Sequence, residues 1–191
     1  MDSPEPTSSD TALPTPQQTL PLVGISSCLL GMRVRYDGQH RLQTGIQAHV
    51  SPYVTLLPLC PESMAGMGIP RRPVNLIEVN GQIKAVGRDD PERDVTERLK
   101  TMGRIIATTY PHLSGYILQS RSPSCGFHTT PIHNEDQSVV LRTNGHGLFV
   151  ETLLHAIPDL PILDDTQLTP TTIQEFLDKV TAQALAFANQ D

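Results

Sequence analysis

The 191-residue sequence contains no tryptophan, and aromatic residues make up only 4% of it, so aliphatic side chains must form most of any core. No apolar run approaches the ~20 residues that a membrane-spanning helix needs, and we expect no membrane association. Positive charge is scarce as well, because the formal net charge is -6. A nucleic-acid-binding surface is usually basic, so no stable nucleic-acid binding is expected. A small anionic substrate is compatible with this negative net charge, since a few arginines can bind one.

Cysteine is also rare, with three residues in the chain. This is too few, in too long a chain, for a disulfide-stabilised scaffold. The N-terminal segment "MDSPEPTSSDTALPTPQQ" lacks the basic and apolar regions of a secretory signal. We therefore expect a cytoplasmic, reducing environment in which the thiols are free or bound to a metal.

The N-terminal residues 1–19 are rich in proline, serine, threonine and glutamine. Such a segment buries too little apolar surface to offset the entropy lost on ordering, and it is predicted to be a disordered tail. Residues 20–191 are predicted to form one α/β domain, since this length can enclose a hydrophobic core. A monomer or a small homo-oligomer is expected.

Apolar segments that suit strands alternate with segments that suit helices in this domain. That order predicts an α/β fold with a mainly parallel sheet flanked by helices, similar to a Rossmann arrangement. Two apolar runs around Asn80-Gly81 predict a small β-hairpin insertion. The expected strands are 22–25, 53–57, 112–118, a short one within 138–147, and 160–165; the expected helices are 44–50, 94–109, 148–155 and 169–188.

The three cysteines recur at one kind of position. Cys28 follows the strand "LVGI", Cys60 follows "YVTLL" and Cys125 follows "GYIL". Ligand sites of open α/β sheets form at the carboxyl ends of the strands, so the three thiols are expected to converge. The pattern leaves several interpretations open: an iron–sulfur cluster with an open iron, zinc with a fourth ligand such as His128 or water, a cysteine nucleophile with a histidine base, or three buried structural cysteines.

Three segments around these cysteines carry a resemblance to a known family. They read "GISSCLLGMRVRYDG", "LCPESMAGMGIPRRP" and "SRSPSCG", and "RDVTERL" and "GHGLFVETLL" accompany them. The sequence resembles the domain-of-unknown-function family 523, which includes thiouracil desulfidases and has the patterns "SACLLGxxVRYDG", "PVCPExxGGLPTPR" and "KSPSCG". The chain departs from these patterns where it has "GIPR" in place of "PTPR" and Arg121 in place of a lysine.

The resemblance implies a cofactor and a reaction. Cys28, Cys60 and Cys125 would hold a [4Fe-4S] cluster with three cysteine ligands and one open iron. The open iron would bind the sulfur of a thiolated pyrimidine base or nucleotide, of the 2- or 4-thiouracil or 4-thiouridine monophosphate type. Sulfur would leave as sulfide by hydrolysis without net redox change. The alternative is a non-catalytic module that binds zinc or an iron–sulfur cluster.

Polar residues in the same segments are candidates for the chemistry. Glu62 lies two residues from Cys60 and is the first candidate to position water or move its proton, with Asp37 second. Arginines suit a phosphate or a pyrimidine carbonyl. The predicted catalytic residues are Glu62, Ser122 and Asp37, and the predicted substrate-binding residues are Ser26, Arg35, Arg71 and Ser124.

Overall fold

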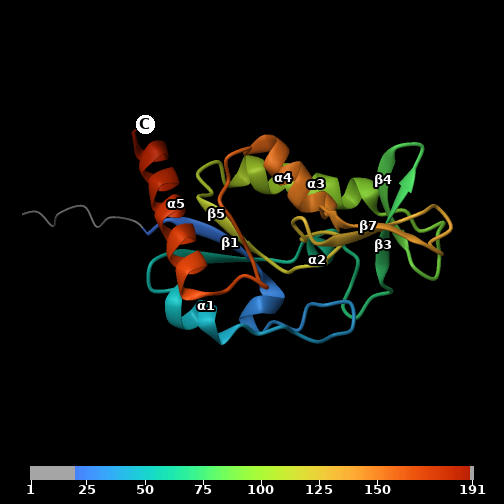
Figure 1. Ribbon diagram of the computed structural model, residues 1–191, viewed down its shortest axis with the longest axis horizontal. Coiled ribbons are helices and arrows are strands. Elements are labelled where there is room, and N and C mark those ends of the chain that lie inside the picture. The colour runs from blue at the N-terminus through green and yellow to red at the C-terminus, as the bar shows by residue number, and fades with distance from the viewer. Residues whose placement is uncertain (1–19, 190–191) are drawn as a thin grey trace, which may run out of the picture.

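A parallel sheet forms one half of the molecule (Figure 1). The computed structural model describes residues 20–189, so the predicted disordered tail lies outside the described residues. The four strands are ordered β2-β1-β5-β8, and every neighbouring pair is parallel. The predicted α/β fold with a mainly parallel sheet flanked by helices is confirmed. These strands are β1 (Leu22–Ser26), β2 (Thr55–Leu59), β5 (Gly115–Leu118) and β8 (Ile162–Asp164).

Helices cover both faces of this sheet, which is why its strands read as continuous apolar runs. Alternate residues of β5 point to opposite faces: Ile117 packs with α1 and α5, whereas Tyr116 and Leu118 pack with α3 and α4. Within residues 20–189, no helix combines the length and apolar character needed to cross a bilayer. The helices are α1 (Thr44–His49), α3 (Thr96–Thr109), α4 (Leu148–Ala156) and α5 (Pro170–Ala188).

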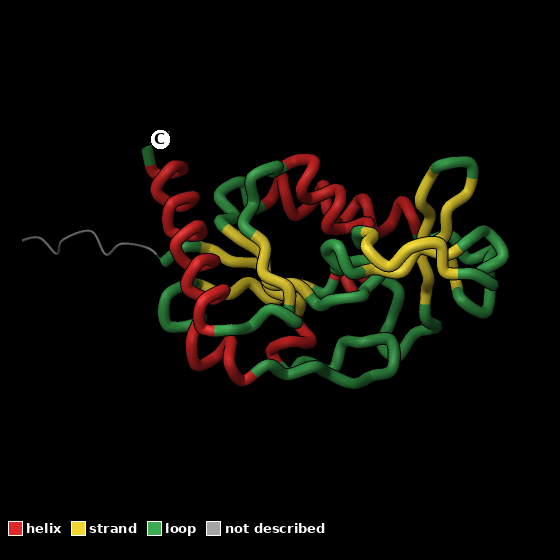
Figure 2. Tube along the Cα trace, viewed as in Figure 1, coloured by secondary structure: helices red, strands yellow, loops and turns green. Residues whose placement is uncertain are grey.

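A second, mixed sheet lies beside the first (Figure 2). The predicted hairpin is confirmed as β3 and β4, and Asn80 and Gly81 both have positive φ, as a type I′ turn requires. The hairpin belongs to a larger sheet of order β4-β3-β6-β7, of which the sequence did not predict β6. Its strands are β3 (Val74–Val79), β4 (Gln82–Gly87), β6 (Thr130–His133) and β7 (Val140–Gly145).

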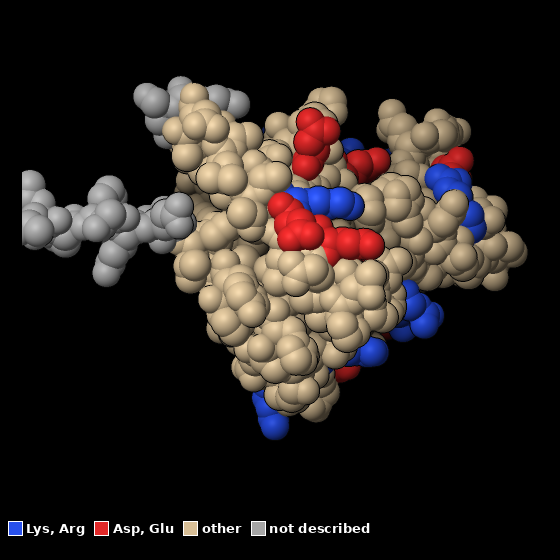
Figure 3. All heavy atoms as spheres, turned by 60° about the vertical axis from the view of Figure 1, so that its left-hand side comes forward, with Lys and Arg blue, Asp and Glu red and all other residues tan. Residues whose placement is uncertain are grey.

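The register of the parallel sheet aligns the carboxyl ends of β1 and its edge neighbour β2. Ser26, the last residue of β1, pairs with Leu59, the last residue of β2. Two short helices begin at these ends: η1 (Ser27–Leu30), a 3-10 helix that contains Cys28, and α2 (Pro61–Met64), which has Cys60 at its N-cap. Both cysteines therefore lie at the start of a short helix that follows a strand of the parallel sheet. The face turned forward in Figure 3 is mostly uncharged, with acidic and basic side chains side by side.

Candidate functional site

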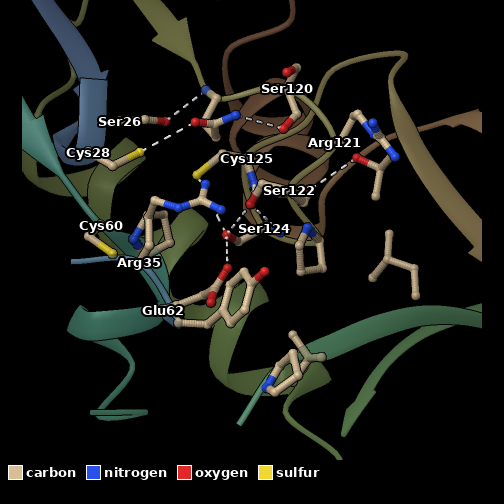
Figure 4. Close-up of a pocket in the computed structure, with 18 of the residues that line it drawn as sticks. Ser26, Cys28, Arg35, Cys60, Glu62, Ser120, Arg121, Ser122, Ser124 and Cys125 are labelled. Carbon is tan, nitrogen blue, oxygen red and sulfur yellow. Dashed lines mark hydrogen bonds between the residues drawn. The ribbon is translucent and has the colours of Figure 1, made fainter. Parts of the chain in front are cut away.

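A cavity of about 530 Å³ lies between the carboxyl edge of the parallel sheet and the second sheet. All three cysteines line it, as the sequence predicts from their positions after strands, and Figure 4 shows their sulfur atoms around one space. The cavity also collects most of the predicted polar site residues. These are Ser26, Arg35, Glu62, Arg71, Ser122 and Ser124.

Asp37 is the exception among the predicted site residues. Its side chain is exposed, and the residue is not among those that line the cavity. The Asp37 carboxylate lies 3.4 Å from Nε of Arg35. This placement leaves Glu62 as the first candidate for proton transfer, with Asp37 as a partner of Arg35.

All three cysteines are free thiols, and Cys28 and Cys125 lie in environments that disfavour charge. Burial raises the pKa of Cys125 to about 12, although the Ser124 hydroxyl beside it acts in the opposite direction. Burial also raises the pKa of Cys28 to about 11, although Arg35 lowers it. At neutral pH these two thiols are protonated in the free protein. Binding of a metal centre therefore has to release their protons, so its uptake depends on pH.

Hydrogen-bonding groups surround the sulfur atoms. The Ser63 hydroxyl donates to Cys60 Sγ at 3.2 Å, and the Ser124 Oγ lies 3.5 Å from Cys125 Sγ. The Cys28 thiol donates to Gln119 Oε1 at 3.7 Å. Neither Ser63 nor Gln119 was predicted from the sequence. Ser63 lies three residues after Cys60 in α2, and such residues are neighbours on a helix, but the sequence did not predict this helix.

Glu62 is fixed by two groups from distant parts of the chain. Its Oε1 accepts a hydrogen bond from Ser124 Oγ at 2.8 Å, and its Oε2 accepts one from Arg71 Nε at 2.6 Å. Arg71 also donates to the carbonyl oxygens of Val34 and Gly68. The side chains of Arg71 and Glu62 are only 4% and 11% exposed. Arg71 is thus engaged in holding Glu62, which is a different role from the predicted contact with substrate.

Ser122 shapes the loop that carries Cys125. Its Oγ accepts hydrogen bonds from the backbone N–H groups of Ser124 at 3.2 Å and Cys125 at 3.1 Å. It also lies 3.0 Å from Ser124 Oγ, which in turn donates to Glu62. A continuous chain of polar contacts therefore runs from Ser122 through Ser124 to Glu62, linking the loops of Cys125 and Cys60.

The start of α4 is packed directly against the same loop. The backbone N–H groups of Leu148 and Val150 donate to the carbonyl oxygens of Pro123 and Ser124 at 3.0 and 3.2 Å. At Gly147, which precedes the helix, an added Cβ would lie 2.3 Å from the carbonyl carbon of Ser124. Glycine is required at Gly147, the second glycine of "GHG", because the two backbones approach each other so closely.

We expect Gly147→Ala to move the Cys125 loop and to lower the free energy of unfolding by about 3 kcal/mol, because backbone atoms cannot easily yield to the new methyl group. Denaturant unfolding of the cluster-free protein measures this change. The matched control is Gly45→Ala in α1, where an added Cβ meets nothing within 4 Å. That control should be neutral or stabilising by up to about 1 kcal/mol. A Gly147→Ala protein as stable as the control would contradict the packing argument.

The donor set fits an iron–sulfur cluster. Among residues 20–189, no three His, Cys, Asp or Glu side chains lie close enough together to bind a single metal ion. Three thiols that line one cavity are the soft ligands that an iron–sulfur cluster prefers. His128, the histidine named for a zinc site, is exposed and is not among the residues that line the cavity.

The fold and the cavity define an α/β protein with three convergent thiols at the carboxyl edge of a parallel sheet. The chain belongs to the 2-thiouracil desulfurase family, whose family model matches residues 23–165. This confirms the resemblance predicted from the three cysteine-bearing segments. The matched residues contain all three cysteines and end before α5.

Two individual proteins illustrate the relationship. The chain is 33% identical over 114 residues to the uncharacterized protein YbbK of Bacillus subtilis (strain 168), covering 55% of this chain and 73% of that protein. It also superposes with a TM-score of 0.63 on the solved structure of the [4Fe-4S]-dependent thiouracil desulfidase TudS, at 24% identity, covering 81% of this chain and 97% of that one. The second similarity shows a shared fold.

Proposed function

We propose that this chain is an iron–sulfur-dependent desulfidase that acts on a thiolated pyrimidine base or nucleotide. The reaction adds water across the thiocarbonyl carbon and releases sulfide, so that C=S and H₂O become C=O and H₂S without net redox change. The observation that carries the proposal is the convergence of three free thiols and one buried carboxylate, Glu62, on a single cavity. Family membership and the fold shared with TudS support it.

Cys28, Cys60 and Cys125 are the residues that would hold a [4Fe-4S] cluster. When bound with one iron free of protein ligands, the cluster supplies a thiophilic Lewis acid that polarises a C=S bond. Ser63 and Gln119 lie against the thiols of Cys60 and Cys28 and would orient them. The buried position of two of the three thiols limits the access of water to the sulfur ligands.

Glu62 is proposed to position the attacking water and accept its proton. Each Glu62 oxygen accepts one hydrogen bond in the present structure and keeps a second acceptor site for water, and one of the two contacts is also able to open. The contact from Ser124 is the one able to yield, because a hydroxyl can rotate toward the substrate, whereas Arg71 is held by two further carbonyl oxygens. Arg71 then keeps the carboxylate in place while Ser124 donates to the substrate or to the departing sulfide.

Arginines that do not contact Glu62 are proposed to bind the substrate. Arg35 lines the cavity and lies near the thiols (Figure 4), and its charge acts on Cys28. Arg41, Arg88 and Arg121 line the same cavity. Guanidinium groups bind planar carbonyl and phosphate oxygens through paired hydrogen bonds. Ser26 is buried behind this surface, and its hydroxyl accepts a hydrogen bond from the backbone N–H of Gln119 at 3.1 Å.

Anaerobic reconstitution of the chain, followed by a sulfide-release assay, tests the proposal. We expect about four iron and four acid-labile sulfide per chain, with broad visible absorbance. The loaded protein should then release sulfide from 2-thiouracil, 4-thiouracil or 4-thiouridine monophosphate, which are assayed separately. A stable cluster with no sulfide released from any of them would favour the non-catalytic module. One zinc ion per chain and no labile sulfide would contradict the proposed cofactor.

A further inference from the structure

Tyr116 has a hydroxyl group that the free protein leaves without a partner. The residue lies on β5 and is fully buried. Within the described residues 20–189, its hydroxyl makes no hydrogen bond. Buried tyrosine hydroxyls usually have a partner, because removing such a group from water without one is unfavourable. The unpaired hydroxyl therefore indicates a hydrogen-bond acceptor that is present only when another group is bound.

The packing of the ring fixes the direction of the hydroxyl. Gly24 pairs with Tyr116 across β1 and β5, and an added Cβ at Gly24 would lie 2.6 Å from the Tyr116 ring. The ring therefore lies over the bare backbone of Gly24. Phe149 of α4 packs edge-on against its other side, with 5.7 Å between ring centroids. A ring enclosed in this way cannot swing its hydroxyl to solvent.

The hydroxyl is directed toward the cysteines. Tyr116 packs in the same apolar cluster as Cys125. Burial raises the pKa of Tyr116 well above its ordinary value, so the hydroxyl keeps its proton at neutral pH. Ser26 lies two residues after Gly24 on the same face of β1, at the carboxyl end where the segment with Cys28 begins. Tyr116 is not among the residues that line the cavity, so it approaches the thiols from inside the protein.

The Ser124 hydroxyl, which lies 3.5 Å from Cys125 Sγ, already donates its proton elsewhere. Ser124 carries one hydroxyl proton and donates it to Glu62. Tyr116 is a neutral donor with its proton free. A thiolate or an inorganic sulfide is an acceptor, and outer hydrogen bonds of this kind orient and tune metal ligands.

We propose that Tyr116 is a positioning residue that donates a hydrogen bond to a sulfur atom of the bound cluster, either the Cys125 thiolate or a sulfide. This inference rests on the proposed [4Fe-4S] cofactor. The hydrogen bond exists only in the loaded protein. It neutralises part of the negative charge on sulfur, which stabilises the bound cluster and raises its reduction potential. In the free protein the same hydroxyl is an unpaired buried group that destabilises the fold.

The variant Tyr116→Phe tests this role because it keeps the ring and removes only the hydroxyl. The two states should respond in opposite directions. In the cluster-free protein the thermal unfolding midpoint should rise, since an unpaired polar group is lost. In the loaded protein the reduction potential should shift to a more negative value, and iron should pass to a chelator roughly tenfold faster. Tyr53→Phe is the matched control at an exposed tyrosine and should change none of these quantities.

The outcomes separate this role from the function proposed above. A loaded Tyr116→Phe protein with an unchanged potential and unchanged iron loss overturns the hydrogen bond, and so does a cluster-free variant that is less stable than the wild type. Wild-type protein that takes up no cluster overturns the proposed cofactor, and this role with it. Opposite responses of the two states support the hydrogen bond even where sulfide release is unaltered.

Discussion

Alanine in place of Cys28, Cys60 or Cys125 is expected to leave a folded chain that holds no [4Fe-4S] cluster. Each thiol comes from a different loop at the carboxyl edge of the sheet, and the chain has no fourth cysteine that could replace a lost ligand. Two remaining thiolates bind a four-iron cluster too weakly to keep it during purification. Iron and labile sulfide should fall from about four each per chain to a small fraction of that.

The matched control for these variants is Ser63→Ala. It removes the hydroxyl that donates to Cys60 Sγ but leaves all three thiols in place. We expect the control to bind the cluster in full stoichiometry and to lose it to a chelator about 10-fold faster than the wild type. A cysteine variant that retains four iron atoms would show that its sulfur is not a ligand. Far-ultraviolet circular dichroism of each variant checks that the fold is kept.

The parallel sheet and its cysteines could be predicted because their signals are local. Apolar runs such as "GYIL" mark buried strands, and each cysteine follows one of them within a few residues. The hairpin was predictable for the same reason, since Asn80-Gly81 specifies its turn. β6 was not, because its four residues "TPIH" include a proline and carry little apolar periodicity. Its place in the second sheet is decided by pairing with β3, about fifty-five residues earlier in the chain.

The contacts that organise the site could not be predicted because they are not local. Arg71 suggested a phosphate site from its residue type alone. Only the fold shows that its guanidinium forms an ion pair with Glu62. Gly147 is required where α4 meets the Cys125 loop, and nothing in the neighbouring sequence indicates that contact. Tyr116 has no distinguishing feature in the sequence, and only the fold shows that its ring lies against Gly24.

Replacing Glu62 with glutamine is expected to have two separable effects. Sulfide release by the loaded protein should fall by about 10² to 10⁴, because an amide cannot accept a proton from water as a carboxylate does. The free energy of unfolding should fall by roughly 3–5 kcal/mol, because Arg71 is left as a buried charge without its partner. Single-turnover sulfide release and denaturant unfolding measure the two effects independently, with rates expressed per bound cluster.

The double variant Glu62→Gln, Arg71→Met distinguishes the chemical role of Glu62 from its structural one. Methionine keeps much of the apolar stem of arginine and removes the unpaired charge. Because a buried ion pair contributes little net stability, the double variant should recover to within about 1 kcal/mol of the wild type. Its sulfide release should stay as low as in Glu62→Gln alone. If turnover returned with stability, Glu62 would act only as the partner of the buried Arg71 charge, and the proton acceptor would have to be sought among the other residues of the cavity.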